Sequence, residues 1–124
     1  MLLYKHNMKL EGASMYKITD TDAMINGTSL QGHIEATYDD LVKAFGEPAY
    51  DSTRDGESDK VHTEWALEFQ DEEGDYITAT IYDWKEESPY TSRSGKYRWH
   101  IGGNGYDAVM AVYDYANLKE VANA

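Results

Sequence analysis

The stretch VHTEWALEFQDEEGDYITATIYDW, residues 61–84, decides the fold that we predict. From Val61 to Phe69 every second residue is apolar or β-branched, which is typical of a strand with one buried face. The acidic run at 71–75 contains a glycine and predicts a turn, and Tyr76–Trp84 then alternates again. The two halves are therefore predicted to pair as an antiparallel hairpin.

The second strand of this hairpin carries large side chains on both faces. Ile77, Ala79 and Ile81 share one face. The other face carries Tyr76, Thr78, Thr80, Tyr82 and Trp84. Burial of aromatic side chains lowers the free energy of the protein. We therefore expect a ligand or another subunit to cover this second face.

Upstream of the hairpin, the sequence predicts a short strand followed by a helix. Residues 28–35 (TSLQGHIE) predict the strand, with Gly32 at a bend or bulge. Residues 38–45 place apolar side chains at helical spacing, after Thr37 as the capping residue and before Gly46 as the stop. Residues 51–60 are expected to form a polar loop.

Downstream of the hairpin, the run YRWHIGGNG at 97–105 predicts a strand that enters a second helix through a glycine-rich loop. Asn104 is expected to cap this helix, with Asp107 three residues later. The predicted buried stripe of the helix is Tyr106, Val109, Met110, Tyr113 and Ala116.

Together these elements predict an α+β fold: an antiparallel sheet of about four strands with two helices packed on it. Residues 1–27 have weak periodicity, and we interpret them as an N-terminal arm with one short strand near residues 15–18. Residues 28–124 are then a single α+β domain.

Charge is unevenly distributed along the chain. The net charge is −12 overall, yet residues 88–106 contain no acid and carry +3, which leaves −15 for the rest. A lone cationic, glycine-rich segment in an acidic chain favours a site for a phosphate-bearing ligand. The same acidity argues against direct binding to nucleic acid or to an anionic membrane, because both need a broad positive field.

Nine residues are candidate ligand contacts. Tyr82 and Trp84 could stack on a nucleobase, Lys85 could meet a phosphate, and Arg98 could bind one with two hydrogen bonds. The complete set is Tyr82, Trp84, Lys85, Arg93, Arg98, His100, Gly102, Gly103 and Asn104. Structural alternatives stay open: packed aromatic residues, a tight glycine turn and ordinary solvated charges.

No pattern in the sequence predicts catalysis. His100 has no nucleophile or carboxylate placed beside it by spacing, and no two histidines lie at metal-ligand spacing. The acids at 71–75 lack the register of an EF-hand loop. There is no cysteine and no apolar run of the ~20 residues that a membrane span needs. We expect a binding protein rather than an enzyme, without metal, cofactor or membrane partner.

The spaced motifs TSLQG, FGEP, EW, ATIYDWK and WHIGG, between residues 28 and 121, resemble a group of small phage-encoded proteins. More particularly, the chain resembles the Thoeris anti-defence sponge family. That resemblance implies a homo-oligomer in the host cytoplasm that sequesters cyclic ADP-ribose isomers, the signals of bacterial TIR-domain immune enzymes, without hydrolysing them. Some members also hold cyclic oligonucleotides at a separate site.

The resemblance also implies roles for the candidate residues. Tyr82 of ATIYDWK would stack on the base, Arg98 and the 102–104 backbone would hold phosphate, and Lys85 and Arg93 would close over the ligand. The strong acidity leaves a second hypothesis. In this alternative, the chain imitates DNA and binds a basic host defence or nucleic-acid enzyme.

Overall fold

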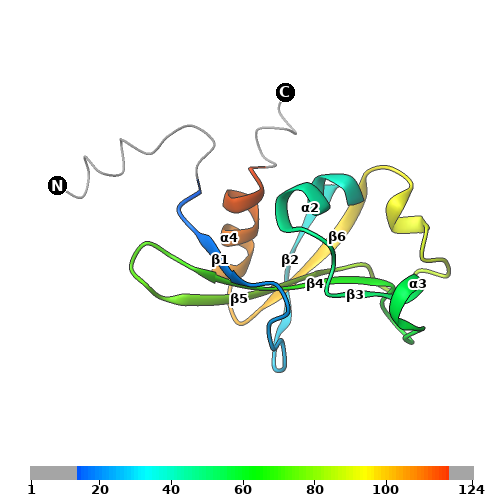
Figure 1. Cartoon of the computed structure of the whole chain (residues 1–124), viewed down its shortest axis with the longest axis horizontal. Helices are drawn as coiled ribbons and strands as arrows, with labels where there is room; N and C mark the ends of the chain where they lie inside the picture. The colour runs from blue at the N-terminus through cyan, green and yellow to red at the C-terminus, as the bar shows by residue number, and fades with distance from the viewer. Residues whose placement is uncertain (1–13, 118–124) are drawn as a thin grey trace.

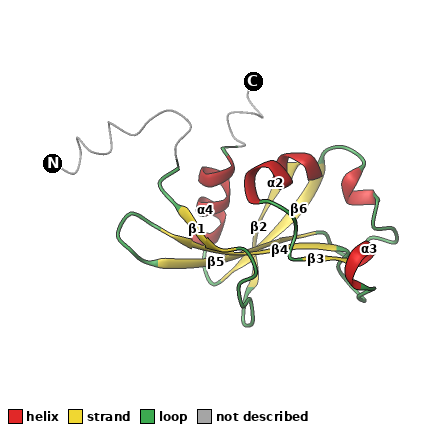
Figure 2. Cartoon of the chain, viewed as in Figure 1, coloured by secondary structure: helices red, strands yellow, loops and turns green. Residues whose placement is uncertain are grey.

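A computed structural model describes residues 14–117, which form a six-stranded antiparallel sheet with α2 and α4 on one face (Figures 1 and 2). The strands are β1 Lys17–Asp20, β2 Ser29–Ala36, β3 Tyr50–Asp51, β4 Thr63–Gln70, β5 Tyr76–Tyr82 and β6 Tyr97–Gly103. The helices are α2 Tyr38–Phe45, α3 Ser52–Asp55 and α4 Asp107–Ala116, with a 3-10 turn η1 at Thr91–Arg93. The predicted α+β class is confirmed, with more strands than the sequence indicated.

The strand order is β1-β4-β5-β6-β2. The short strand β3 pairs with β4 at Thr63 and Glu64, so β1 and β3 share one edge of β4. Strand β2 forms the opposite edge of the sheet. The connection at 21–28 therefore joins two edges, and Figure 1 shows it projecting on the side of the sheet away from α2 and α4.

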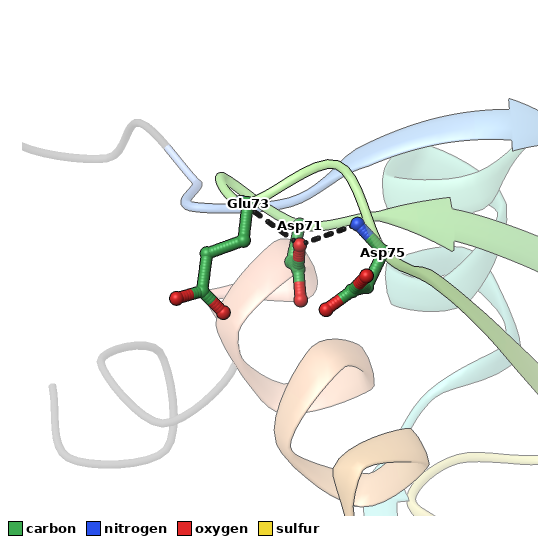
Figure 3. A group of neighbouring side chains, drawn as sticks. All are labelled: Asp71, Glu73 and Asp75. Carbon is green, nitrogen blue, oxygen red and sulfur yellow. Dashed lines mark hydrogen bonds between the residues drawn. The ribbon is translucent and has the colours of Figure 1, made fainter.

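The predicted hairpin is confirmed as β4 and β5, which pair in register from Glu64 opposite Tyr82 to Gln70 opposite Tyr76. Its turn is held by Asp71. The Asp71 Oδ1 atom accepts hydrogen bonds from the backbone N–H groups of Glu73 and Asp75, each at 2.9 Å (Figure 3). Of the acids in this segment, Asp71 therefore shapes the turn.

The core lies between the sheet and the helices. Trp65 of β4 and Trp99 of β6 are both buried, and their rings meet edge to face with centroids 5.4 Å apart. Each indole N–H has a backbone acceptor: Trp65 donates to Gly46 at 2.8 Å and Trp99 donates to Ala36 at 3.0 Å. Burial of these large rings therefore leaves neither indole N–H unsatisfied.

Helix α2 forms as its sequence predicts. The Thr37 side chain accepts from the Asp40 backbone N–H at 3.0 Å, and the Asp40 carboxylate accepts from the Thr37 N–H at 3.2 Å. This reciprocal pair satisfies two N–H groups that the first helical turn would otherwise leave free. Gly46 ends the helix with φ of +85°.

Residues 51–60 are not the continuous polar loop that we expected. Asp51 lies in β3 and caps the four-residue helix α3, where its Oδ1 accepts from the Thr53 N–H at 2.9 Å. The Oδ2 atom of Asp51 pairs with Arg93 at 3.0 Å. The local cap of Asp51 on Thr53 was not recognised within this polar run, and the ion pair joins segments too far apart in sequence to leave a local pattern.

The position predicted for the glycine-rich loop is also wrong. Gly102 and Gly103 belong to β6 and lie opposite residues of both β2 and β5. A Cβ on Gly103 would lie 2.4 Å from the Cβ of Ala108 in α4, and one on Gly102 would lie 2.7 Å from Cγ2 of Thr80. These glycines are required for close packing of the strand against its neighbours.

Helix α4 begins later than predicted, and its predicted stripe is right at Val109, Tyr113 and Ala116 but wrong at Tyr106 and Met110. It starts at Asp107, and Asn104 is exposed and does not cap it. The buried residues are Ala108, Val109, Ala111 and Val112, whereas Tyr106 is 65% exposed and Met110 is 54% exposed. The small Ala108 side chain allows the helix to approach Gly103 of β6 closely, and the larger Tyr106 and Met110 side chains lie on the outer face.

Of the predicted N-terminal arm, residues 1–13 lie outside the described residues. The strand expected near residues 15–18 is β1, two residues further along, and it pairs with β4. Among the described residues, no helix is long and apolar enough to cross a membrane.

We expect the Gly103→Ala substitution to lower the free energy of unfolding by roughly 1–3 kcal/mol, because its Cβ collides with Ala108 and the strand cannot move away. Urea denaturation followed by tryptophan fluorescence measures this change. The neighbouring exposed Asn104→Ala is the control, for which we expect no loss beyond about 0.5 kcal/mol. Equal stability of the two variants would contradict the packing role of Gly103.

Candidate functional site

The face of the sheet that carries no helix presents a row of aromatic and ionisable side chains. His33 of β2 lies opposite His100 of β6, His100 lies opposite Tyr82 of β5, and Tyr82 lies opposite Glu64 of β4. Each of these residues alternates with buried core residues of its own strand, so all four point away from the helices. Strand register therefore assembles a row from four segments that are distant in sequence.

Four rings in and beside this row form what we call the aromatic cluster: His33, Tyr82, Trp84 and His100. The Tyr82 and His100 rings stack, with centroids 5.3 Å apart and planes 27° apart. His33 meets His100 at 4.7 Å, and Trp84 lies 6.0 Å from Tyr82 and 6.3 Å from His100. Trp84 is 37% exposed, so part of its indole surface is available for stacking.

Cations surround the aromatic cluster. The ammonium groups of Lys60 and Lys85 lie 5.7 Å and 5.6 Å from the centre of the Trp84 ring. Lys85 has φ of +55°, and its backbone N–H donates to the Lys60 carbonyl at 2.7 Å, which holds both lysines beside Trp84. Arg98 is exposed and lies two residues before His100 on β6, so the two side chains share a face of the sheet. Arg98 forms no ion pair within residues 14–117.

The environment changes the protonation of this face. Burial lowers the pKa of His33, and the Arg98 charge adds to that effect. Burial also lowers the pKa of His100, with the charges of His33 and Arg98 next in importance. Burial raises the pKa of Tyr82 and of Glu64, and the Glu64 carboxyl accepts a hydrogen bond from Thr80 at 2.9 Å. Near neutral pH the cluster thus presents neutral rings, with lysine side chains beside Trp84 and the Glu64 carboxyl beside Tyr82.

Five of the nine predicted site residues lie together here: Tyr82, Trp84, Lys85, Arg98 and His100. Gly102 lies beneath them on the same face, where a Cβ would lie 3.5 Å from Cε1 of Tyr82. Gly103 faces α4 instead, and Asn104 follows the end of β6 as an exposed residue.

Arg93 lies on the opposite side of the sheet from the aromatic cluster. Its guanidinium stacks 4.3 Å from the centre of the Tyr38 ring, and its Nη2 contacts Asp51 at 3.0 Å and Thr63 Oγ1 at 3.2 Å. Tyr38 belongs to α2, and Thr63 shares the helix-bearing face with Trp65. Arg93 therefore joins α2, β3 and η1, and it does not lie beside Tyr82 as the sequence interpretation required.

Two residues of this region were assigned no role from the sequence. His33 enters the aromatic cluster only through the β2–β6 register, which no local pattern reveals. Asp83, which lies between Tyr82 and Trp84 in the sequence, is buried and fixes the chain that carries these two rings. Its Oδ1 accepts from the backbone N–H groups of His62 and Thr63 at 2.8 Å and 3.0 Å, and its Oδ2 accepts from Ser92 at 3.0 Å. A polar residue between two aromatic ones in a predicted strand was the available signal for Asp83.

Two other features lie at the far end of the hairpin. The carboxylates of Asp71, Glu73 and Asp75 have oxygen atoms within 4.8 Å of one another, and the Asp71 carboxylate is already engaged in the turn (Figure 3). A shallow hollow nearby is lined by residues 14–17 and by Gln70, Asp71, Glu72 and Gly74. Neither feature adjoins the aromatic cluster, because the length of the β4–β5 hairpin separates them.

The aromatic cluster offers base stacking and attraction for anions, and it contains no nucleophile paired with a base among the described residues. The chain matches no protein-family model, no curated protein and no solved structure. What the protein binds must therefore be argued from the chemistry of this face.

Proposed function

We propose that the chain is a phage anti-defence binding protein that sequesters a small anionic cyclic nucleotide, of the cyclic ADP-ribose class, without hydrolysing it. One observation carries the proposal: stacked rings of Tyr82 and His100 adjoin a partly exposed Trp84 beneath two lysines. Such a ligand has a base that can stack and a pyrophosphate that needs positive charge. A platform of rings with cations at its edge matches both needs.

The local charge supports an anionic ligand in spite of the overall acidity. Lys60, Lys85 and Arg98 lie near the aromatic cluster, and none of them forms an ion pair within the described part of the chain. Cations that are not engaged in an ion pair can meet phosphate oxygens, although Glu35 is the cross-strand neighbour of Arg98. The acidic remainder of the chain would also repel large polyanions, which favours a small ligand.

We further propose that the protein acts as a homo-oligomer in the host cytoplasm. Several large apolar side chains are exposed on the single chain: Met24, Leu30, Tyr76, Tyr90, Tyr106 and Met110. Such side chains are typical of surfaces that a second subunit covers.

Native mass spectrometry with cyclic ADP-ribose isomers and cyclic oligonucleotides tests the proposal. We expect an oligomer that gains discrete masses of intact ligand. Masses of cleaved ligand would contradict binding without hydrolysis. If no nucleotide adds mass, the sponge function is wrong, and the acidic DNA mimic, supported by the net charge of −12, becomes the better hypothesis. A pull-down with basic nucleic-acid enzymes, in which salt weakens capture, would then test the mimic.

We expect the Arg98→Gln substitution to weaken binding of a cyclic ADP-ribose isomer by about three- to tenfold at low ionic strength, because it removes an exposed charge near the ligand. The difference should shrink as salt screens the charge. Calorimetric titration at two salt concentrations measures both effects. The control is Arg54→Gln, since Arg54 pairs with Asp55 on α3 at 2.6 Å, away from the aromatic cluster. Equal losses in the two variants would indicate a general charge effect instead of a contact.

A further inference from the structure

His33 and His100 form a pair at the edge of the aromatic cluster. They are direct cross-strand neighbours, their ring centroids are 4.7 Å apart, and their planes are inclined by 62°. The other side of His100 stacks on Tyr82. The His100 ring is therefore fixed between two neighbours, while His33 lies on the edge strand of the sheet.

One nitrogen of His100 has an unusual environment. Its Nδ1 atom is buried and has no hydrogen-bond partner among the described residues. A buried N–H without an acceptor is costly, so the neutral ring is best satisfied with its proton on Nε2. The Nε2 atom is not enclosed in this way, and it therefore remains as a donor for a ligand oxygen.

The charged groups around the pair come from each neighbouring element. Glu35 of β2 lies opposite Arg98 of β6, and Glu64 of β4 lies beyond Tyr82. Asp83 and Glu86 favour the protonated form of His100, while burial and Arg98 oppose it in both histidines and hold each pKa below its ordinary value. An anion beside Arg98 would offset that repulsion and favour proton uptake.

We propose that His33, His100 and Arg98 form a subsite for the phosphate groups of the ligand, and that its occupation is accompanied by uptake of a proton on His33. The His100 Nε2–H and the Arg98 guanidinium donate to phosphate oxygens, and the protonated His33 adds a third donor and a charge. The ligand class is a pyrophosphate or a phosphate diester. This inference deepens the proposed function and rests on it for the identity of the natural ligand.

Inorganic pyrophosphate is the probe for the subsite alone. The imidazole signals of the full-length protein are followed by NMR between pH 5 and pH 8, in pyrophosphate and in chloride of equal ionic strength. We expect pyrophosphate to move the titration midpoint of His33 upward by about one pH unit, because an adjacent anion stabilises the charged ring. The Arg98→Gln protein should show a smaller change.

His62 is the internal control for this titration. Its ring nitrogens contact Ser52 Oγ at 2.9 Å and the Glu86 carbonyl at 2.8 Å, so its signals should not respond to pyrophosphate. The proposal is overturned if pyrophosphate leaves the His33 and His100 titrations as they are in chloride, or if His62 responds equally.

A second experiment separates this inference from the proposed function. We expect His33→Gln to bind a cyclic ADP-ribose isomer roughly three- to fivefold more weakly than the unmodified protein at pH 6, and nearly equally at pH 8, where His33 is neutral before binding. Equal binding by both proteins at both pH values would refute the subsite and leave the nucleotide function intact. A His33 response to pyrophosphate without binding of any cyclic nucleotide would support the subsite and refute the nucleotide function.

Discussion

The Asp83→Ala protein is expected to unfold with a free energy about 3 kcal/mol below that of the unmodified chain. The substitution removes the acceptor of two backbone N–H groups, at His62 and Thr63, and of the Ser92 hydroxyl. Buried donors that lose their partner keep the full cost of leaving water. Since a domain of this size is stabilised by roughly 5–15 kcal/mol, the change is large, and urea denaturation measures it.

The matched control is Asp59→Ala, because Asp59 is exposed and is not one of the groups that hydrogen-bond to Asp83. We expect this control to lie within about 0.5 kcal/mol of the unmodified protein. Asp83→Asn should lose less stability than Asp83→Ala, since its amide oxygen still accepts. An Asp83→Ala protein as stable as the Asp59→Ala protein would show that Asp83 does not anchor the segment that carries Trp84.

The second large effect is expected for Trp84→Ala, which should weaken binding of the cyclic nucleotide by roughly 5- to 150-fold. This range corresponds to the stacking energy of one base on one aromatic ring, about 1–3 kcal/mol. The side chain is 37% exposed and lies outside the core, so its loss should leave the fold intact. Calorimetric titration with cyclic ADP-ribose isomers measures the affinity.

Tyr90→Ala controls for the loss of an exposed aromatic side chain elsewhere. Tyr90 is 62% exposed, and its backbone N–H and carbonyl hydrogen-bond to the side chains of Ser88 and Ser94. Its substitution should leave the affinity unchanged. If both variants bind like the unmodified protein, the aromatic cluster is not the ligand platform.

The sequence predicts best those parts of the fold that local periodicity determines. Alternation from Val61 to Phe69 correctly identifies the β4–β5 hairpin, and the capping residue Thr37 correctly locates the start of α2. The short elements β3 and α3 were missed, because β3 is defined by its pairing with β4 and by the ion pair of Asp51 with Arg93, and the Asp51 cap of α3 lies within a polar run. Contacts between distant segments leave no repeating pattern in either segment.

In the candidate site, too, the sequence predicts the features that depend on local alternation and misses those that depend on contacts between distant segments. The alternation of side chains along the predicted strands places Tyr82, Arg98 and His100 on the face opposite the core. In the structure, Tyr82 and His100 are cross-strand neighbours whose rings stack, and Arg98 shares their face. Gly103 was misjudged because a glycine needed for helix packing and a glycine needed for an anion loop look alike in sequence. His33 was missed because only the pairing of β2 with β6 brings it to His100.

The three tryptophan indole N–H signals in a proton–nitrogen NMR spectrum give the most direct test of the central claim, that the aromatic cluster binds a cyclic nucleotide. Trp84 is partly exposed within the cluster, whereas Trp65 and Trp99 are buried and donate to Gly46 and Ala36. On addition of the cyclic ADP-ribose isomers, we predict that the Trp84 signal shifts with saturation and that the other two stay in place. An unchanged Trp84 signal with every isomer would contradict the account.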